Sequence, residues 1–185
     1  MIEMLVFAGL VGLLLLWAVV IYNRLVRNRN LVEEGWSGIE TQLKRRSNLI
    51  PNLVRTVKGF AAQEKGVFER VTELRAKTGQ VHEPAERGRM ESMLGQALAN
   101  VFAVAEAYPE LKSNRNFLDL QTQLSAIEYE IQLARRYYNG TVRNLNILIE
   151  SFPSNLVAGT FGFRQAEFFE IENASDRAVP EVSFI

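Results

Sequence analysis

The chain has 185 residues, and its 21 Lys and Arg side chains balance 21 Asp and Glu side chains, so the formal net charge is zero. This balance argues against a surface made to bind nucleic acid or another polyanion. The chain contains no Cys, which excludes disulfides, thiolate metal sites and Cys nucleophiles. The length suits one ordinary domain together with a membrane anchor.

An uncharged, largely apolar run opens the chain, from Met4 to Asn23, and is closed by Glu3 and Arg24. About 20 apolar residues in a helix span a bilayer, so the run predicts a transmembrane helix. The alternative is a cleavable signal peptide. The run is too long for one, no basic residues precede it, and no Ala-x-Ala-like site follows. We expect residues 1–23 to be a permanent anchor in the lipid bilayer.

The charges on the two sides of this run differ. Residues 1–3 contain no Lys or Arg, whereas Arg24 and Arg27 begin a basic stretch. The positive-inside rule then places the N-terminus outside and the rest of the chain in the cytoplasm. Trp17 and Tyr22 suit the aromatic belt at the membrane interface, although packing of Trp17 within lipid explains its position equally well.

A first amphipathic stretch begins at Asn30, where apolar residues start to recur at helical spacing. It continues in phase to Lys77 if the helix kinks at Pro51, which we prefer to a helix that restarts there. Glycine weakens a helix, and Gly59-Phe60 is where we expect any break.

Two further helical stretches follow. One runs from Met90 to Ala105, and the other, from Phe117 to Ile149, has apolar residues in steps of three and four. Such steps are typical of helices packed in a bundle at small crossing angles. Asn114 or Asn116 is the predicted N-cap of the last stretch, and Phe152-Pro153 is its predicted end.

No segment alternates between apolar and polar residues, so we predict no sheet. The expected fold is all-α, with one N-terminal transmembrane helix followed by a bundle of long antiparallel amphipathic helices. Residues 24–172 would form the soluble bundle domain and residues 173–185 an extended C-terminal tail. Late aromatic residues either cap the open end of the bundle or form a patch shared between subunits: Phe161, Phe163, Phe168, Phe169 and Phe184.

Sequence motifs of the common catalytic sites are missing, including the phosphate-binding, dinucleotide-binding and nucleophile-elbow patterns. His82 is the only histidine and cannot build a zinc site without Cys, so we expect it in a solvated loop. Glu128 and Glu130 lack the Glu-x-x-His partners of a di-metal bundle and are expected on a solvated face. The sequence therefore predicts no catalytic, cofactor-binding or metal-binding residue.

Two polar clusters interrupt the predicted helices, and each has two interpretations. Such side chains either fix the register of neighbouring helices or form a face that binds a partner. The clusters comprise Arg45, Arg46, Asn48, Pro51 and Asn52, and then Arg135, Tyr137, Asn139, Arg143 and Asn144, with Asn146 beside them.

Several stretches together resemble the LemA family, in the order in which the family has them. They are Arg45-Arg46-Ser47-Asn48-Leu49-Ile50-Pro51-Asn52-Leu53-Val54, Thr56–Gly59, Tyr108–Lys112, Arg135–Asn139 and Phe152–Asn155. The resemblance covers nearly the whole chain. It implies a single-pass bacterial membrane protein with a long-helix bundle, without enzyme activity or a cofactor. It also implies an association with envelope quality control and with membrane proteases of the HtpX type.

The anchor, the long helices and the missing chemistry lead to one functional hypothesis. We expect a scaffold or adaptor in the bacterial inner membrane that assembles into homo-oligomers. The alternative is a regulatory or accessory subunit of a membrane protease or transporter in envelope quality control.

Overall fold

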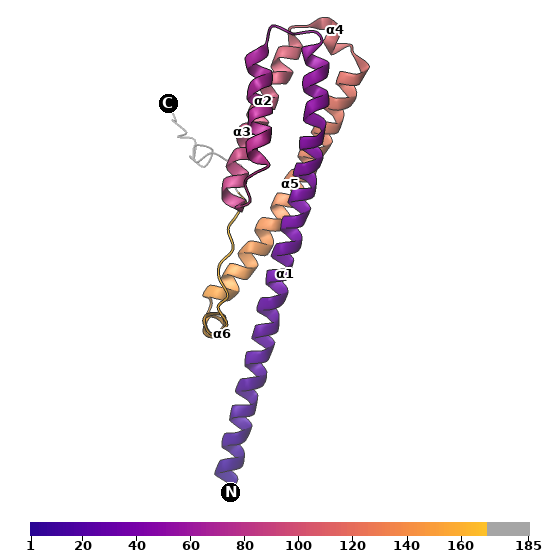
Figure 1. Cartoon of the computed structure of the whole chain (residues 1–185). Helices are drawn as coiled ribbons and strands as arrows, with labels where there is room; N and C mark the ends of the chain where they lie inside the picture. Colours follow the sequence, from indigo (N-terminus) through magenta and orange to yellow (C-terminus); the bar gives the residue numbers. More distant parts are fainter. Residues whose placement is uncertain (170–185) are drawn as a thin grey trace, which may run out of the picture. The chain divides into compact units, whose positions relative to one another are not determined.

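The structure is a computed structural model that describes residues 1–169, which contain helices, turns and one extended segment but no strand (Figure 1). The helices are α1 (Ile2–Lys58), α2 (Lys65–Thr78), α3 (Pro84–Glu106), α4 (Pro109–Lys112), α5 (Arg115–Glu150) and α6 (Ser154–Thr160). The predicted all-α fold is confirmed. The tail predicted for residues 173–185, with Phe184, lies outside the described residues.

Contacts group the described chain into two units, each of which contains part of α1 and part of α5. The first unit comprises Met1–Thr41 and Gln132–Phe168. The second comprises Gln42–Ile131 together with Phe169. Each unit has its own buried side chains.

Helix α1 is a single helix of 57 residues that includes both the uncharged run and the first amphipathic stretch. It continues through Pro51, as predicted. It ends at Lys58, so the prediction of a helix that continues to Lys77 is wrong.

The break falls at Gly59-Phe60, where the sequence analysis places any interruption. The N–H groups of Phe60 and Ala61 both donate to the carbonyl of Val57, at 3.0 Å each, which closes a turn. Glycine favours such a break because its backbone loses the most entropy in a helix. After the turn, α2 packs against α3 and buries its apolar stripe of Phe68, Val71 and Leu74. Burial of this stripe favours the turn over a longer α1.

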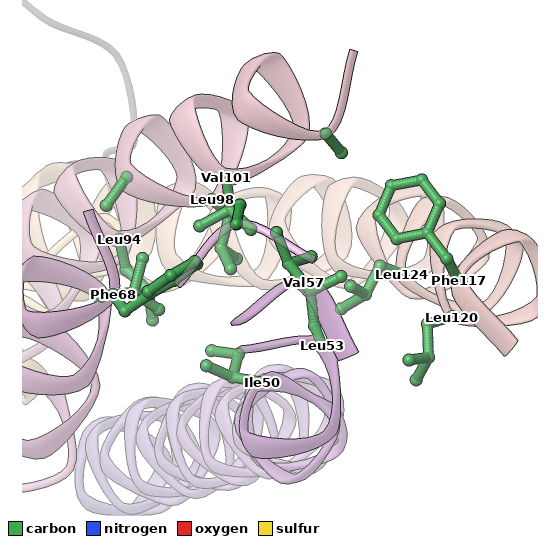
Figure 2. Close-up of a cluster of buried hydrophobic side chains, with 14 of the residues drawn as sticks. Ile50, Leu53, Val57, Phe68, Leu94, Leu98, Val101, Phe117, Leu120 and Leu124 are labelled. Carbon is green, nitrogen blue, oxygen red and sulfur yellow. The ribbon is translucent and has the colours of Figure 1, made fainter. Parts of the chain in front are cut away.

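The second unit is a helical bundle with a continuous apolar core (Figure 2). The end of α1, then α2, α3 and the start of α5 run in alternating directions, as in up-and-down bundles (Figure 1). Side chains from all four segments converge on the core: Ile50, Leu53 and Val57 from α1, Phe68 from α2, Leu94, Leu98 and Val101 from α3, and Phe117, Leu120 and Leu124 from α5.

An asparagine cap begins α5. The backbone N–H of Phe117 donates to Oδ1 of Asn114 at 3.2 Å. Of the two predicted caps, Asn114 and Asn116, it is therefore Asn114 that caps the helix. A side-chain oxygen at this position satisfies a helix N–H group that has no partner within the helix. The helix ends at Glu150, just before the predicted end at Phe152-Pro153.

In the first unit, α5 packs closely on α1 at a glycine. A Cβ atom added to Gly35 would lie 3.2 Å from the Cα atom of Tyr138, so the absence of a side chain allows this close approach. The rings of Trp36 and Tyr138 lie beside it, with centroids 5.5 Å apart. After α6, residues 163–168 run back along α5 as an extended segment (Figure 1).

Candidate functional site

The core of the second unit contains a buried arginine. Arg46, on α1, is only 4% exposed. A guanidinium taken out of water is costly unless it is paired and hydrogen-bonded. Nη2 of Arg46 donates to the carboxylate of Glu91 and, at 3.3 Å, to the Glu91 carbonyl, and Nη1 donates to the carboxylate of Glu128 at 2.8 Å. Helices α3 and α5 thus supply its counter-charges.

A second arginine completes this network. Nε of Arg87 donates to Oε1 of Glu91 at 3.1 Å, so the buried Glu91 carboxylate lies between two guanidinium groups. Arg87 also donates to the carbonyls of Thr78 and Val81, which connects the end of α2 to the start of α3. Two positive and two negative side chains balance one another, and we call Arg46, Arg87, Glu91 and Glu128 the charge network.

One turn after Arg46, a proline leaves a carbonyl of α1 without its usual donor. Pro51 has no N–H, so the carbonyl of Ser47, four residues earlier, cannot form its helical hydrogen bond. Nε of Arg75, on α2, donates to this carbonyl at 2.8 Å and to the Ser47 hydroxyl at 3.1 Å. The proline in α1 therefore creates the acceptor that binds α2.

These contacts position helices, and the charged groups of the network bind one another. The Glu91 carboxylate, the most buried acid of the network, already accepts from two arginines. Within residues 1–169, no three His, Cys, Asp or Glu side chains lie close enough together to hold a metal ion. His82 and Glu130 are exposed. Glu128 corrects our expectation of a solvated face, because it is half-buried and paired with Arg46.

The sequence analysis missed Glu91, Arg87 and Arg75. A signal for Glu91 is present in the sequence: it lies three residues before Leu94 and in phase with the apolar stripe of α3. Arg46 likewise lies in phase with the stripe of α1, between Leu43 and Ile50. Opposite charges on the apolar stripes of two helices indicate a buried pair. No comparable pattern distinguishes Arg75.

The other members of the first polar cluster lie near or at the surface. Arg45, Asn48 and Asn52 are exposed, and Pro51 is half-buried. Two shallow polar grooves run between α1 and α5 on this surface of the second unit. Their linings include Gln42, Arg45, Gln123 and Glu130 for one, and Asn52, Arg55, Asp119 and Gln123 for the other. A partner-binding role for this cluster stays a prediction.

The second polar cluster lies on α5 in the first unit. Tyr137, Arg143 and Asn144 are exposed, whereas Arg135 and Asn139 are half-buried. Asn146, beside the cluster, binds a neighbouring segment of extended chain. Its Nδ2 donates to the carbonyl of Ala166 at 3.0 Å, and its Oδ1 accepts from the Ala166 N–H at 2.9 Å.

Tyr138 attaches the same extended segment to α5. Its hydroxyl donates to the carbonyl of Glu167 at 2.8 Å, and its ring is buried. Burial raises the pKa of Tyr138 from 10.0 to about 12, and the negative charge of Glu167 adds to the shift.

Aromatic contacts join α1 to the segment that follows α6. The ring of Tyr22 lies 4.8 Å from that of Phe161 and 5.8 Å from that of Phe163, measured between centroids. The guanidinium of Arg29 lies 5.7 Å from the centre of the Phe163 ring, in the range of a cation–π contact.

The predicted membrane flanks are accessible on α1. Trp17, Tyr22, Arg24 and Arg27 are all exposed. The N-terminal part of α1 is long and apolar enough to cross a membrane, and its large apolar side chains are exposed.

Comparison with known proteins identifies the family. The model of the LemA family matches residues 35–184. The chain belongs to the LemA family. It is similar to magnetosome protein MamQ 2 of Paramagnetospirillum magneticum, with 28% identity over 184 residues, covering 85% of this chain and 68% of that protein. MamQ of Magnetospirillum gryphiswaldense is 23% identical with the same coverage. Protein LemA of Metamycoplasma hominis is 28% identical over 153 residues, covering 80% and 68%.

In this LemA-family chain, the stretch Arg45–Val54 is a junction of helices. Arg46 binds α3 and α5, while Ser47 and Pro51 together provide the acceptor for α2. One turn and a half of α1 therefore contacts every other long helix of the second unit.

Because Pro51 leaves the Ser47 carbonyl to Arg75, the effects of mutating Pro51 and Arg75 on stability should depend on each other. Arg75→Ala should lower the free energy of unfolding of the full-length protein by about 1–3 kcal/mol, because the Ser47 carbonyl loses its donor. In a Pro51→Ala background the same change should cost clearly less, because the N–H of the new residue can donate to Ser47. Denaturant unfolding followed by circular dichroism measures both, with Arg89→Ala, on the exposed surface of α3, as the control. Equal costs in the two backgrounds would contradict this account.

The raised pKa of Tyr138 predicts a reversal with pH. Below about pH 10 the wild type should be more stable than Tyr138→Phe by about 1 kcal/mol, the contribution of one hydrogen bond. Between about pH 10 and 12 the phenol ionises in the unfolded chain before it does so in the folded one, so the wild type loses stability. The loss is on the order of 2 kcal/mol, and Tyr138→Phe should be the more stable protein at pH 12. The prediction would be contradicted if the difference in unfolding free energy between the wild type and Tyr138→Phe were the same from about pH 8 to about pH 12, a range on either side of about pH 10.

Proposed function

We propose that this LemA-family protein is a single-pass, membrane-anchored helical scaffold or adaptor of the bacterial inner membrane. Its helical domain lies in the cytoplasm, assembles with other copies of the chain, and acts by binding without catalysis. The proposal is supported by α1, which is one helix from Ile2 to Lys58.

The two parts of α1 have different surroundings. Large apolar side chains of its N-terminal part are exposed, which suits lipid as the solvent. Further along the same helix, Ile50, Leu53 and Val57 lie in the core of the second unit. One helix thus contributes both to the apolar, exposed run and to the core of the bundle, as a membrane-anchored scaffold requires.

The distribution of charge supports the orientation. No Lys or Arg precedes the apolar run, whereas the exposed side chains of Arg24, Arg27 and Arg29 follow it within two turns. Basic residues are retained on the cytoplasmic side of a membrane. The N-terminus would then lie outside.

Binding in place of catalysis agrees with where the charged groups lie. The buried acids and bases of the second unit neutralise one another. The surface grooves suit contact between copies, because α1 contributes Arg45 and Arg55 to them while α5 contributes Glu130 and Asp119. In a two-fold dimer, the positive side of one copy would meet the negative side of the other. The relatives carry family or magnetosome names and no enzyme name.

The mass of the full-length protein in lipid nanodiscs, with co-purifying proteins identified in the same sample, tests the proposal. We expect a discrete homo-oligomer. Arg45→Glu with Arg55→Glu should shift the mass towards the monomer because like charges would then meet, and adding Asp119→Arg with Glu130→Arg should restore the oligomer. Arg70→Glu, on the exposed surface of α2, is the matched control.

A monomer would contradict self-assembly. A monomer bound stoichiometrically to a membrane protease or transporter would instead favour the regulatory-subunit function.

A further inference from the structure

We propose that the corner between α5 and α6 is a second membrane-contact surface that lies in the interfacial layer of the bilayer crossed by α1. The corner is defined by Phe152, Leu156 and Phe161. The inference rests on the proposed membrane anchoring, and it adds a site at which the folded part of the protein itself touches lipid.

The corner exposes three large apolar side chains. Phe152 is 79% exposed, Leu156 60% and Phe161 58%. On the other side of α6, Val157 and Ala158 are buried. A short helix with one packed face and one exposed apolar face is suited to lie at a membrane surface.

A second uncharged run in the sequence includes this corner. From Ser151 to Phe163 there is no Asp, Glu, Lys or Arg, and the run is bounded by Glu150 and Arg164. It is much shorter than the roughly 20 residues that cross a bilayer. Its exposed apolar side chains are therefore suited to the membrane interface and not to a second membrane span.

Contacts within the first unit show at which point along α1 the corner lies. The ring of Phe161 packs on that of Tyr22, and Tyr22 is the penultimate residue of the run that ends at Asn23. The corner therefore lies where the apolar part of α1 ends, beside the N-terminal part of α1 (Figure 1). Tyrosine and phenylalanine at this depth bury their rings among acyl chains near the headgroups.

Basic side chains follow the uncharged runs on both chain segments that meet near the corner. Arg24, Arg27 and Arg164 are exposed, and Arg29 lies on the Phe163 ring. Two acidic groups of the first unit have partners there: Glu33 pairs with Arg29 at 3.9 Å, and Glu150 accepts from Gln165. Anionic phospholipids complement an apolar patch that has basic side chains near it. We choose a lipid surface over a second copy of the chain because Phe161 packs on Tyr22, where the uncharged run of α1 ends.

Site-directed spin labelling of the full-length protein tests this inference, because the chain has no native Cys. The variants Leu156→Cys and Phe152→Cys would each carry one nitroxide per chain, in nanodiscs of mixed zwitterionic and anionic phospholipid. Val20→Cys is the control inside the predicted span, and Leu118→Cys, an exposed leucine of α5 in the second unit, is the aqueous control. Collisions with oxygen report lipid, and collisions with a water-soluble nickel complex report water.

We expect oxygen collisions to exceed nickel collisions several-fold at Val20, Leu156 and Phe152, and the reverse at Leu118. Nickel-dominated collisions at Leu156 and Phe152, with Val20 in lipid, would overturn the inference while the anchor stands. Low collision rates with both reagents at the corner would also overturn it, since they would mean that protein covers the surface. Nickel-dominated collisions at Val20 would overturn the anchor and the inference together.

Discussion

Burial of the Arg46 guanidinium is the constraint on which the second unit depends. A charge in an apolar core is tolerated only with close counter-charges, so Glu91 on α3 and Glu128 on α5 have to lie beside it at one register. Arg87 then holds the other Glu91 oxygen and the turn that connects α2 to α3. Apolar stripes alone permit bundles with shifted registers, and the charge network penalises them because a shifted helix would leave a buried charge unpaired.

The same region of α1 explains why a proline is compatible with so long a helix. Pro51 removes one hydrogen bond within α1, and Arg75 replaces it with a hydrogen bond from α2. The hydrogen bond that α1 lacks at Pro51 is thus replaced by one that holds α2 against α1. The N-terminal part of α1 is apolar and exposed, so one helix carries both a run long and apolar enough to cross a membrane and the contacts that organise the bundle.

Periodicity was sufficient to predict the all-α fold, the ends of α5 and the position of the break at Gly59, because helix patterns and turn residues act locally. It did not predict that the chain reverses at this point, since the choice depends on the burial of α2 against α3. The charge network was missed because Arg46 was assigned to a polar cluster and Glu128 to a solvated face, and because Glu91 was not recognised as a charge in phase with the apolar stripe of α3. The bonds from Asn146 and Tyr138 to residues 166 and 167 involve backbone atoms of an extended segment, and no side-chain pattern encodes them.

Hydrogen exchange of the full-length protein in nanodiscs, read by mass spectrometry, tests most directly whether Arg46 holds the second unit in register. Wild type would be compared with Arg46→Met, which keeps an unbranched side chain but removes the charge. Our account predicts faster exchange in α3 around Glu91 and in the part of α5 around Glu128, with unchanged exchange in α6 of the first unit. Unchanged exchange in α3 would contradict the central role assigned to Arg46.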